Sequence, residues 1–403
     1  MPVFAVRHPI SNSQAERAEM PAIVVGITNQ ETCLVLKGRL RSLRQAGFQV
    51  TLVSSPGELL DHTAASEGVE SHGIPMRRRI SPAADLLSLI RLWHFLRRLR
   101  PEMVEFSTPK AGLLGTLAAR ICGVPLRIYF LRGLKLETTT GFKHRILLAA
   151  ERLASASAHV VLCISESLRE EALALGIAPE SKLHLLGGGS SHGVDMELYS
   201  PGQSDVRELY GIPPDAHVVG FVGRLTRDKG LPELVKAFDA ILRAERKTHL
   251  LLVGWFDAAE DSLDKDVRRR IESHERIHVS GFVEGTAAFY RAMDVMVLPT
   301  WREGFPNAVL EAAATGIPVV TTMSTGSRDS VIPEVTGLLI PPGYPDAISE
   351  AVLKLLGDPE RRRRMGKAAR AWVLEHYNDE RVLGSTAAYY KSLLSLTASL
   401  STG

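Results

Sequence analysis

The stretch Trp301–Val320, WREGFPNAVLEAAATGIPVV, decides the fold. It comes directly after an apolar run, it contains an alanine-rich helix pattern at 308–315, and it ends within a second apolar run at 318–322. Two strand patterns joined through an amphipathic helix are typical of a βαβ unit, whose strands lie parallel in one sheet. Glu303 and Glu311, eight residues apart, flank the turn that leads into this helix. The stretch therefore predicts a parallel α/β sheet with carboxylates near the carboxyl end of one strand.

The same alternation of apolar runs and amphipathic segments extends along the chain from Pro21. Strands are predicted at 22–27, 48–53, 103–106, 126–130, 159–164 and 182–186, and again at 217–222, 249–253, 277–280, 295–299 and 318–322. Helices are predicted at 34–46, 85–100, 112–122, 144–155, 166–175, 231–244, 265–273, 286–292, 308–315, 344–356, 359–377 and 379–396. Residues 187–204 are dense in Gly, Ser and Pro, as in a linker. We expect an α/β fold of two doubly wound domains, at 21–200 and 201–378, followed by a closing helix at about 379–400.

Length and composition fit a soluble globular protein. At 403 residues the chain exceeds one ordinary core, and no apolar run approaches the roughly 18 residues that cross a bilayer. The first 20 residues lack the apolar core of a secretory signal, which predicts a cytoplasmic protein. Cys33, Cys122 and Cys163 lie far apart, which favours buried thiols over a disulfide framework or a zinc site.

Charge is unevenly distributed along the chain. Residues 1–150 hold 20 Lys and Arg against 11 Asp and Glu, and the remainder holds 28 against 34. A basic first half suggests an acidic partner such as anionic lipid, a phosphorylated acceptor or nucleic acid. An ordinary arginine-rich surface explains the same numbers equally well.

One polar loop is predicted directly after the strand at 217–222. Its sequence, GFVGRLTRDKG at 220–230, places Arg224 and Lys229 between a strand end and a helix start. A guanidinium fork and an ammonium group can together neutralise a diphosphate. The spacing of a P-loop is absent, and the alternative is a loop whose charges are simply solvated.

The opening stretch forms the second such loop. Pro306 and Asn307 suit the first turn of a helix, whose unpaired N–H groups attract anions, and Gly304 allows backbone to approach a ligand closely. Glu303 and Glu311 can accept hydrogen bonds from the paired hydroxyls of a ribose or a sugar ring. Taken singly, Glu311 is also explained as a first-turn acid and Glu303 as an exposed loop acid. Together with the basic loop they describe a pocket for a diphosphate that carries sugars.

At these residues the chain resembles the retaining glycosyltransferases of family 4, which have the GT-B fold. The resemblance covers nearly the whole chain from Pro21 and is more specific in the second half. The motifs that carry it are E-x7-E (Glu303 and Glu311), G-R-x4-K-G (Gly223, Arg224, Lys229 and Gly230) and G-V-D (Gly193, Val194 and Asp195).

The resemblance implies two Rossmann-like domains facing across a cleft, with the C-terminal helix crossing back to the N-terminal, acceptor-binding domain. It implies retaining transfer of a hexose or N-acetylhexosamine from a UDP-sugar to a lipid-linked or polysaccharide acceptor in bacterial cell-surface glycan synthesis. Such enzymes need neither a metal nor another cofactor. Asp264 and Asp266 form a D-x-D motif, but they open a charged helix pattern, so they are interpreted as acids that complement the helix dipole.

The resemblance also implies roles for single residues of the second domain. Glu303 contacts the donor hexose, Glu311 binds the ribose, and Arg224 and Lys229 stabilise the departing nucleoside diphosphate. The remaining donor-binding residues are expected to be Gly223, Gly304, Phe305, Pro306 and Asn307 around the sugar and phosphates, with Phe282 and Val283 against the base.

The first domain offers weaker candidates. By position, Thr28 and Asn29 lie on the loop that closes over the donor phosphates, and Arg132 and Gly133 line the cleft. No histidine occupies the acceptor side where many family members have one. His144, His159 and His192 are predicted to be structural or solvent-facing rather than catalytic.

A basic amphipathic stretch follows residue 75. Met76–Arg79 and 86–100 combine Arg91, Arg97, Arg98 and Arg100 with leucines and Trp93, which are expected to pack inward. The chain also resembles enzymes that extend sugars on undecaprenyl diphosphate, so peripheral contact with the anionic inner face of the cell membrane is expected. The alternative is an ordinary helix with a cationic outer face.

Other functions stay open at this point. They are a GDP-mannose-dependent mannosyltransferase, a UDP-sugar epimerase of the same architecture and a non-catalytic subunit that binds nucleotide sugar. Nucleic-acid binding is not expected, because aromatic residues do not interleave with the basic cluster.

Overall fold

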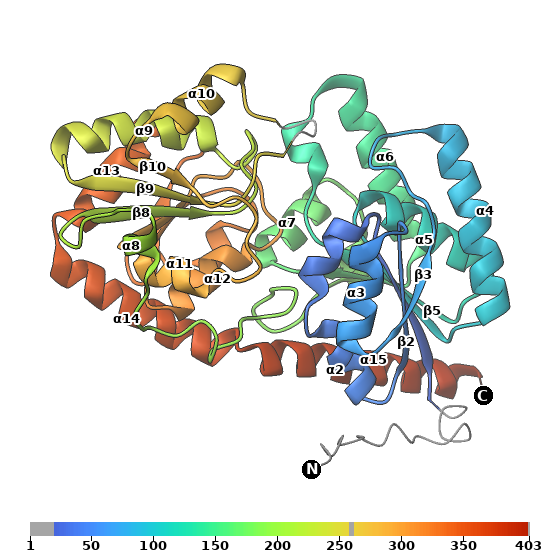
Figure 1. Cartoon of the computed structure of the whole chain (residues 1–403). Helices are drawn as coiled ribbons and strands as arrows, with labels where there is room; N and C mark the ends of the chain where they lie inside the picture. The colour runs from blue at the N-terminus through green and yellow to red at the C-terminus, as the bar shows by residue number, and fades with distance from the viewer. Residues whose placement is uncertain (1–19, 258–261, 402–403) are drawn as a thin grey trace, which may run out of the picture. The chain divides into compact units, whose positions relative to one another are not determined.

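The computed structural model describes residues 20–257 and 262–401, and it contains two parallel sheets (Figure 1). Seven strands follow the order β3-β2-β1-β4-β5-β6-β7, and six follow the order β10-β9-β8-β11-β12-β13. In each sheet the first strand lies inside, with later strands added on both sides. This is the doubly wound arrangement that the sequence predicts.

The strands of the first sheet are β1 (Ala22–Gly26), β2 (Gln49–Ser54), β3 (Glu70–Gly73), β4 (Met103–Ser107), β5 (Leu126–Leu131), β6 (Val160–Cys163) and β7 (Leu183–Leu185). Those of the second are β8 (His217–Val222), β9 (Thr248–Val253), β10 (Ile277–Val279), β11 (Val295–Leu298), β12 (Val319–Thr322) and β13 (Gly337–Ile340). Every strand predicted from the sequence is present. Two were missed, β3 and β13, because edge strands of four residues carry too short a pattern.

The helices up to the second sheet are α2 (Arg39–Gln45), α3 (Glu58–Glu67), α4 (Pro82–Leu99), α5 (Pro109–Ile121), α6 (Gly141–Ser157), α7 (Glu166–Ala174) and α8 (Val206–Leu209). Those that follow are α9 (Leu231–Ala244), α10 (Lys265–Ser273), α11 (Ala287–Ala292), α12 (Asn307–Ala314), α13 (Pro345–Leu356), α14 (Pro359–His376) and α15 (Asp379–Ser401). Helices α3 and α8 were not predicted. The helix expected at 34–46 is interrupted, because Gly38 adopts a left-handed φ of 75° and separates a 3₁₀ turn from α2.

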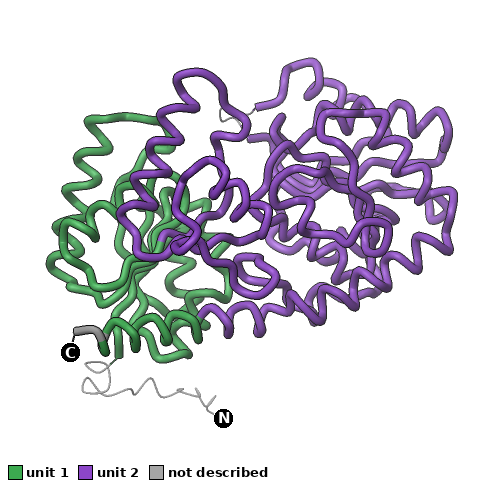
Figure 2. The backbone as a smooth tube through the Cα atoms, turned by 180° about the vertical axis from the view of Figure 1, so that it is seen from behind, with its two compact units in different colours: residues 1–128, 387–403 green, residues 129–386 purple. Residues whose placement is uncertain are grey.

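By compactness the chain divides into two units, which Figure 2 colours separately. Unit 1 comprises residues up to 128 together with 387–403, and unit 2 comprises 129–386. The last turns of α15 therefore belong with the N-terminal residues, as the family resemblance implies. The domain limits at 200 and 378 remain predictions.

Unit 1 is held by a core and by one buried polar cluster. Helices α4 and α5 pack together and bury Leu92, Leu96 and Ala118. Arg39 of α2 donates to Glu105 Oε2 of β4 at 2.7 Å, and the hydroxyl of Tyr390 of α15 donates to the same oxygen at 2.6 Å. All three side chains are fully buried. A buried charge is costly unless it is paired, and here Arg39 and Glu105 pair with each other. The cluster fixes α15 within unit 1.

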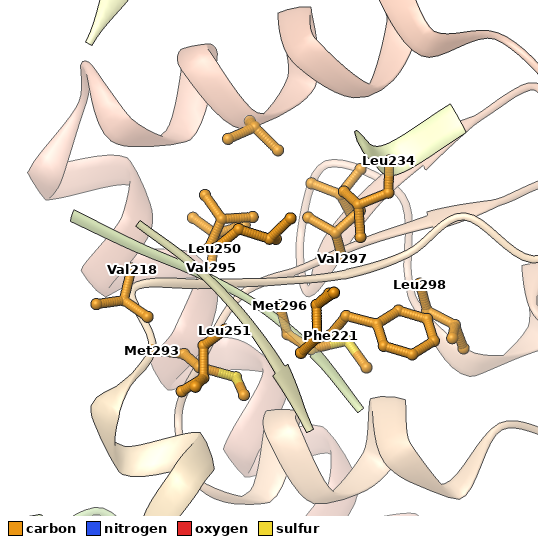
Figure 3. Close-up of a cluster of buried hydrophobic side chains, with 14 of the residues drawn as sticks. Val218, Phe221, Leu234, Leu250, Leu251, Met293, Val295, Met296, Val297 and Leu298 are labelled. Atoms are coloured by element: carbon orange, nitrogen blue, oxygen red, sulfur yellow. The ribbon is translucent and has the colours of Figure 1, made fainter. Parts of the chain in front are cut away.

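Unit 2 has a larger apolar core around β8, β9 and β11. Figure 3 shows Phe221, Leu250 and Val297 among its members, which are buried completely. Helices α9 and α13 cover one face of this sheet, and α11 and α12 cover the other (Figure 1). Since both faces are covered, the strands read as continuous apolar runs rather than as alternating patterns.

Two further expectations concern cysteines and membrane spans. Cys33 and Cys163 are buried and Cys122 is half-buried, and none forms a disulfide, as predicted. Among the described residues, no helix has the length and apolar character needed to cross a membrane.

A buried carboxyl in unit 2 makes stability depend on pH. Tyr129 donates to Glu151 Oε2 at 2.6 Å, and burial raises the pKa of Glu151 to about 7, although this hydrogen bond opposes the rise. A folded-state pKa above the unfolded value contributes stability at low pH that is lost as the pH rises from about 4.5 through 7. We predict that Glu151→Gln raises the free energy of unfolding at pH 8 by up to about 3 kcal/mol, with little change at pH 4.5.

Thermal melts at both pH values measure this effect. Glu350→Gln, at an exposed position of α13, is the matched control and is expected to change neither melt. Equal melting temperatures of Glu151→Gln and the parent protein at pH 8 would contradict the prediction.

Candidate functional site

The six-stranded sheet has one topological switch point, between β8 and β11. β9 and β10 lie on one side of β8, and β11, β12 and β13 lie on the other. Loops that follow the strands on either side of such a point diverge and leave room for a ligand. These are the loops at 223–230 and 299–306, which contain the residues singled out in the sequence.

An ion pair connects the two loops. Lys229 Nζ of the first loop contacts Glu303 Oε1 of the second, and both side chains are about five-sixths buried. Gly230, with a φ of 74°, lets the first loop pass against the second, because a Cβ there would lie 2.0 Å from the Pro299 carbonyl oxygen. Lys229 and Glu303, predicted on separate loops, therefore lie together.

Asp228 is a second connection between these loops, and the sequence analysis missed it. Its carboxylate accepts from Thr226 at 2.6 Å and from Arg302 at 3.0 Å. Burial opposes ionisation, but Lys229, Thr226 and Arg302 outweigh it and hold the pKa of Asp228 below its usual value. The backbone oxygen of Asp228 also accepts from the Trp301 amide at 2.9 Å. Its only sequence signal was its place directly before Lys229.

Arg224 lies on the same loop with its own carboxylate partner. It donates from Nη1 to Asp257 Oδ2 at 2.6 Å, and about a third of the arginine side chain is exposed. Asp257 was not predicted, since it follows a different strand, β9. Both cations of the predicted diphosphate site are thus oriented by carboxylates before any ligand binds.

Glu311 lies in the second turn of α12. Its Oε2 accepts from the hydroxyl of Tyr290 at 2.8 Å and from Thr286 Oγ1 at 3.4 Å. Tyr290 is completely buried, and desolvation, together with the nearby carboxylate of Glu311, raises its pKa well above the usual value. Tyr290 therefore stays a donor and fixes the Glu311 carboxylate, a positioning role that the sequence did not reveal.

The start of α12 is shaped by Pro306 and Asn307. Pro306 is the N-cap residue, no side chain caps the helix, and its first turn contains no acid. Phe305 is buried and packs against Tyr377, with ring centroids 5.3 Å apart. Asn307 contacts His192, which places this histidine at the start of α12.

Another segment of the same chain lies very close to the backbone of Gly304. A Cβ at Gly304 would lie 2.0 Å from the Arg132 carbonyl oxygen. Gly133 and Gly326 also face it, because their Cβ positions would lie 3.3 Å from the Gly304 amide nitrogen and 2.3 Å from its carbonyl oxygen. That Gly304 lets backbone approach a ligand stays a prediction, and the structure shows the Arg132 carbonyl beside this glycine. Arg132 and Gly133 are brought to the site loop in this way.

The surface expected to contact the nucleotide base, around Phe282 and Val283, is formed by glycines and aromatic rings. A Cβ at Gly254 would lie 1.9 Å from the carbonyl oxygen of Gly223, which brings the ends of β8 and β9 together. Phe282 is half-exposed and meets Trp255 edge to face, with centroids 5.4 Å apart, while Val283 packs on the core. Trp255, which was not predicted, adds a second ring to this surface.

Thr28 and Asn29 lie in unit 1, at the switch point between β1 and β4. Thr28 Oγ1 lies 2.6 Å from Thr108 Oγ1 and accepts from the Ala111 amide at 3.1 Å, so it caps the start of α5. Thr108 has a φ of 69°, which is strained for a β-branched residue. Asn29 accepts from Thr32 at 2.6 Å through Oδ1.

The D-x-D motif lies at α10, as predicted. Asp264 is the N-cap residue, and Asp266 lies in the first turn and pairs with Arg269 at 3.1 Å. Independence of a metal remains a prediction. His144 contacts the Leu136 carbonyl oxygen, which agrees with a structural role.

Comparison with known proteins identifies the family. Residues 216–358 match the model of glycosyl transferases group 1, and residues 38–189 match that of the glycosyl transferase 4-like domain. The chain is 34% identical over 369 residues to the capsular polysaccharide biosynthesis glycosyltransferase CapM of Staphylococcus aureus, covering 91% of this chain and 96% of that protein. The chain therefore belongs to the family of glycosyl transferases group 1, and the protein is a glycosyltransferase.

The names of two other relatives include a sugar-nucleotide donor. A UDP-Gal:alpha-D-GlcNAc-diphosphoundecaprenol alpha-1,3-galactosyltransferase of Escherichia coli is 26% identical, with 77% of this chain and 81% of that protein covered. A GDP-mannose-dependent alpha-mannosyltransferase of Mycolicibacterium smegmatis is 32% identical, with 82% and 86% covered. Among solved structures, Anabaena Alr3699/HepE in complex with UDP and glucose is 18% identical, with a TM-score of 0.77 over 92% of this chain and 100% of that chain. The fold is therefore the GT-B fold implied by the sequence motifs.

The close packing of Gly304 against Arg132, Gly133 and Gly326, here called the glycine junction, predicts the effect of adding a single methyl group. Gly304→Ala must displace the Arg132 carbonyl or the site loop, so we expect a loss of about 1–3 kcal/mol in the free energy of unfolding. Thermal melts measure the loss. Gly384→Ala, on α15 with no atom within 4 Å of its Cβ position, is the control and is expected not to lower stability. A Gly304→Ala protein as stable as the parent would show that the junction is loose.

Proposed function

We propose that the protein transfers a hexose or N-acetylhexosamine from a UDP-sugar, with retention of configuration, to a lipid-linked or polysaccharide acceptor. The observation that supports this most is the pairing of Lys229 with Glu303 beside Arg224 and Glu311 at one switch point. Cations suited to a diphosphate and carboxylates suited to sugar hydroxyls then lie within one site of unit 2.

The chemical step follows from these groups. The bond between the sugar C1 and the diphosphate oxygen breaks while a bond from C1 to the acceptor oxygen forms on the same face. The acceptor proton passes to the departing phosphate oxygen, which leaves an α-glycoside and free UDP. Arg224 and Lys229 stabilise the charge that develops on the diphosphate. Glu303 holds the hexose, and Glu311, fixed by Tyr290, binds the ribose.

Bacterial cell-surface glycan synthesis is the proposed context. Its support is the likeness to the capsular and the diphosphoundecaprenol-linked enzymes. The likeness to the mannosyltransferase keeps a GDP-mannose donor as the alternative. The Glu311 carboxylate does not distinguish the two donors, because UDP and GDP carry the same ribose.

Removing either cation tests the chemical role. Arg224→Ala and Lys229→Ala are each expected to lower the rate of UDP release from UDP-hexoses, measured with acceptor lipid present, by about 10²–10³-fold. Arg227→Ala removes a cation of the same loop that lies 4.0 Å from Asp264 and is more than half exposed, so this control should retain the parent rate. Unchanged turnover in both site variants would refute the leaving-group assignment.

Contact with an anionic membrane is proposed for one surface of unit 1. The row of apolar side chains on α4 is not wholly buried: Leu86, Leu87 and Ile90 are half-exposed, as is Ile80 before the helix, contrary to the expectation that the leucines pack inward. The exposed arginines of this surface are Arg77, Arg78, Arg79, Arg91, Arg97, Arg98 and Arg100. Asp85, the sole acid between 77 and 100, pairs with Lys110 at 2.6 Å, so this stretch carries no other acid beside its arginines.

Apolar residues flanked by arginines suit the headgroup region of an anionic bilayer. We predict that the protein sediments with vesicles containing phosphatidylglycerol but not with pure phosphatidylcholine. The triple variant R77Q/R78Q/R79Q should weaken this binding on the order of a hundredfold. Leu86→Ser with Leu87→Ser should also weaken it, whereas Ile121→Ser, at an exposed apolar residue of α5, should not. Equal binding to both vesicles would contradict the proposal.

A further inference from the structure

His192 lies on the glycine-rich loop that follows β7, and this loop reaches the start of α12. Asn307 Nδ2 lies 3.0 Å from His192 Nε2 and 3.2 Å from Nδ1. On the other side of the same carboxamide, Ser190 Oγ donates to Asn307 Oδ1 at 3.2 Å. Two residues of the loop thus hold both ends of the Asn307 side chain.

The loop itself is held firmly. The Ser190 amide donates to the Ile164 carbonyl oxygen at 2.8 Å, and the Val194 amide donates to the Tyr377 carbonyl oxygen at 2.8 Å. Ser190 has a left-handed φ of 69°, and its hydroxyl oxygen accepts from the Gly193 amide at 3.1 Å. A non-glycine residue in this conformation persists only where its surroundings fix it. The imidazole is therefore presented from a rigid support.

The Asn307 amide group can only donate, so it favours the tautomer of His192 in which Nε2 is the acceptor. Ser191 Oγ lies 3.0 Å from His192 Nδ1. With the proton on Nδ1 donated to Ser191, Nε2 is the acceptor, and it faces the Asn307 amide at the shorter of the two distances. In this tautomer His192 is an acceptor for the first residue of α12.

We infer that His192 is a positioning residue for the distal phosphate of the donor, and that it acts through Asn307. Asn307 begins the helix whose uncapped first turn is the proposed phosphate site, so fixing its side chain fixes the amides beside it. This inference rests on the proposed function and goes beyond it by assigning the histidine, which the sequence suggested to be structural or solvent-facing.

Binding of UDP and UMP, measured by calorimetry, tests the inference. UMP lacks the distal phosphate, so a residue that acts there changes UDP affinity alone. We expect His192→Phe to weaken UDP about fivefold to tenfold and to leave UMP within about twofold. His192→Gln keeps an acceptor and should restore most of the affinity. His62→Phe, at an exposed histidine of unit 1, is the matched control and should bind both nucleotides as the parent does.

The coupling of the two residues is tested by combining changes. Asn307→Ala should weaken UDP about as much as His192→Phe, and the double variant should bind no more weakly than either single variant. Additive losses, or equal losses of UDP and UMP, would overturn the inference and leave the loop with a folding role. If the parent protein prefers GDP to UDP, the same variants are compared for binding of GDP and GMP. A parent that binds neither nucleotide refutes the proposed function, and the inference falls with it.

Discussion

The ion pair between Lys229 and Glu303 is the interaction on which the site depends. It joins two loops that are 74 positions apart in sequence and that follow strands on opposite sides of the switch point. Both groups are mostly buried, and an unpaired charge at this depth would be costly, so each keeps the other in place. Asp228 with Arg302, and Asp257 with Arg224, extend the same principle to the neighbouring cations.

Pre-paired cations have a consequence for the ligand. A bound diphosphate has to offer oxygen atoms that replace or share the carboxylates now facing Arg224 and Lys229. A neutral ligand cannot do this, whereas a nucleoside diphosphate supplies both the charge and the acceptor geometry. In the proposed function, the carboxylate of Glu303 becomes available to the hydroxyls of a sugar once Lys229 turns to the phosphate. The exchange of partners would thus couple the arrival of the phosphate to recognition of the sugar.

The elements that could be predicted from the sequence are those with local signals. Buried parallel strands such as β8 and β11 read as apolar runs, and Pro306 with Asn307 marked the start of α12. Edge strands such as β3 left no such pattern. Within the site, Asp228, Tyr290 and Trp255 were missed because their roles arise from contacts with distant segments, and propensity and spacing do not encode these. Gly304 was singled out for close approach to a ligand, which stays a prediction, and only the fold reveals its close approach to Arg132.

A crystal structure of the protein with bound UDP would test the central claim most directly. The account predicts the ribose hydroxyls within hydrogen-bond distance of the Glu311 carboxylate, and the diphosphate against Arg224, Lys229 and the first amides of α12. UDP bound at another place, or bound here with its ribose away from Glu311 and its phosphates away from both cations, would contradict the account.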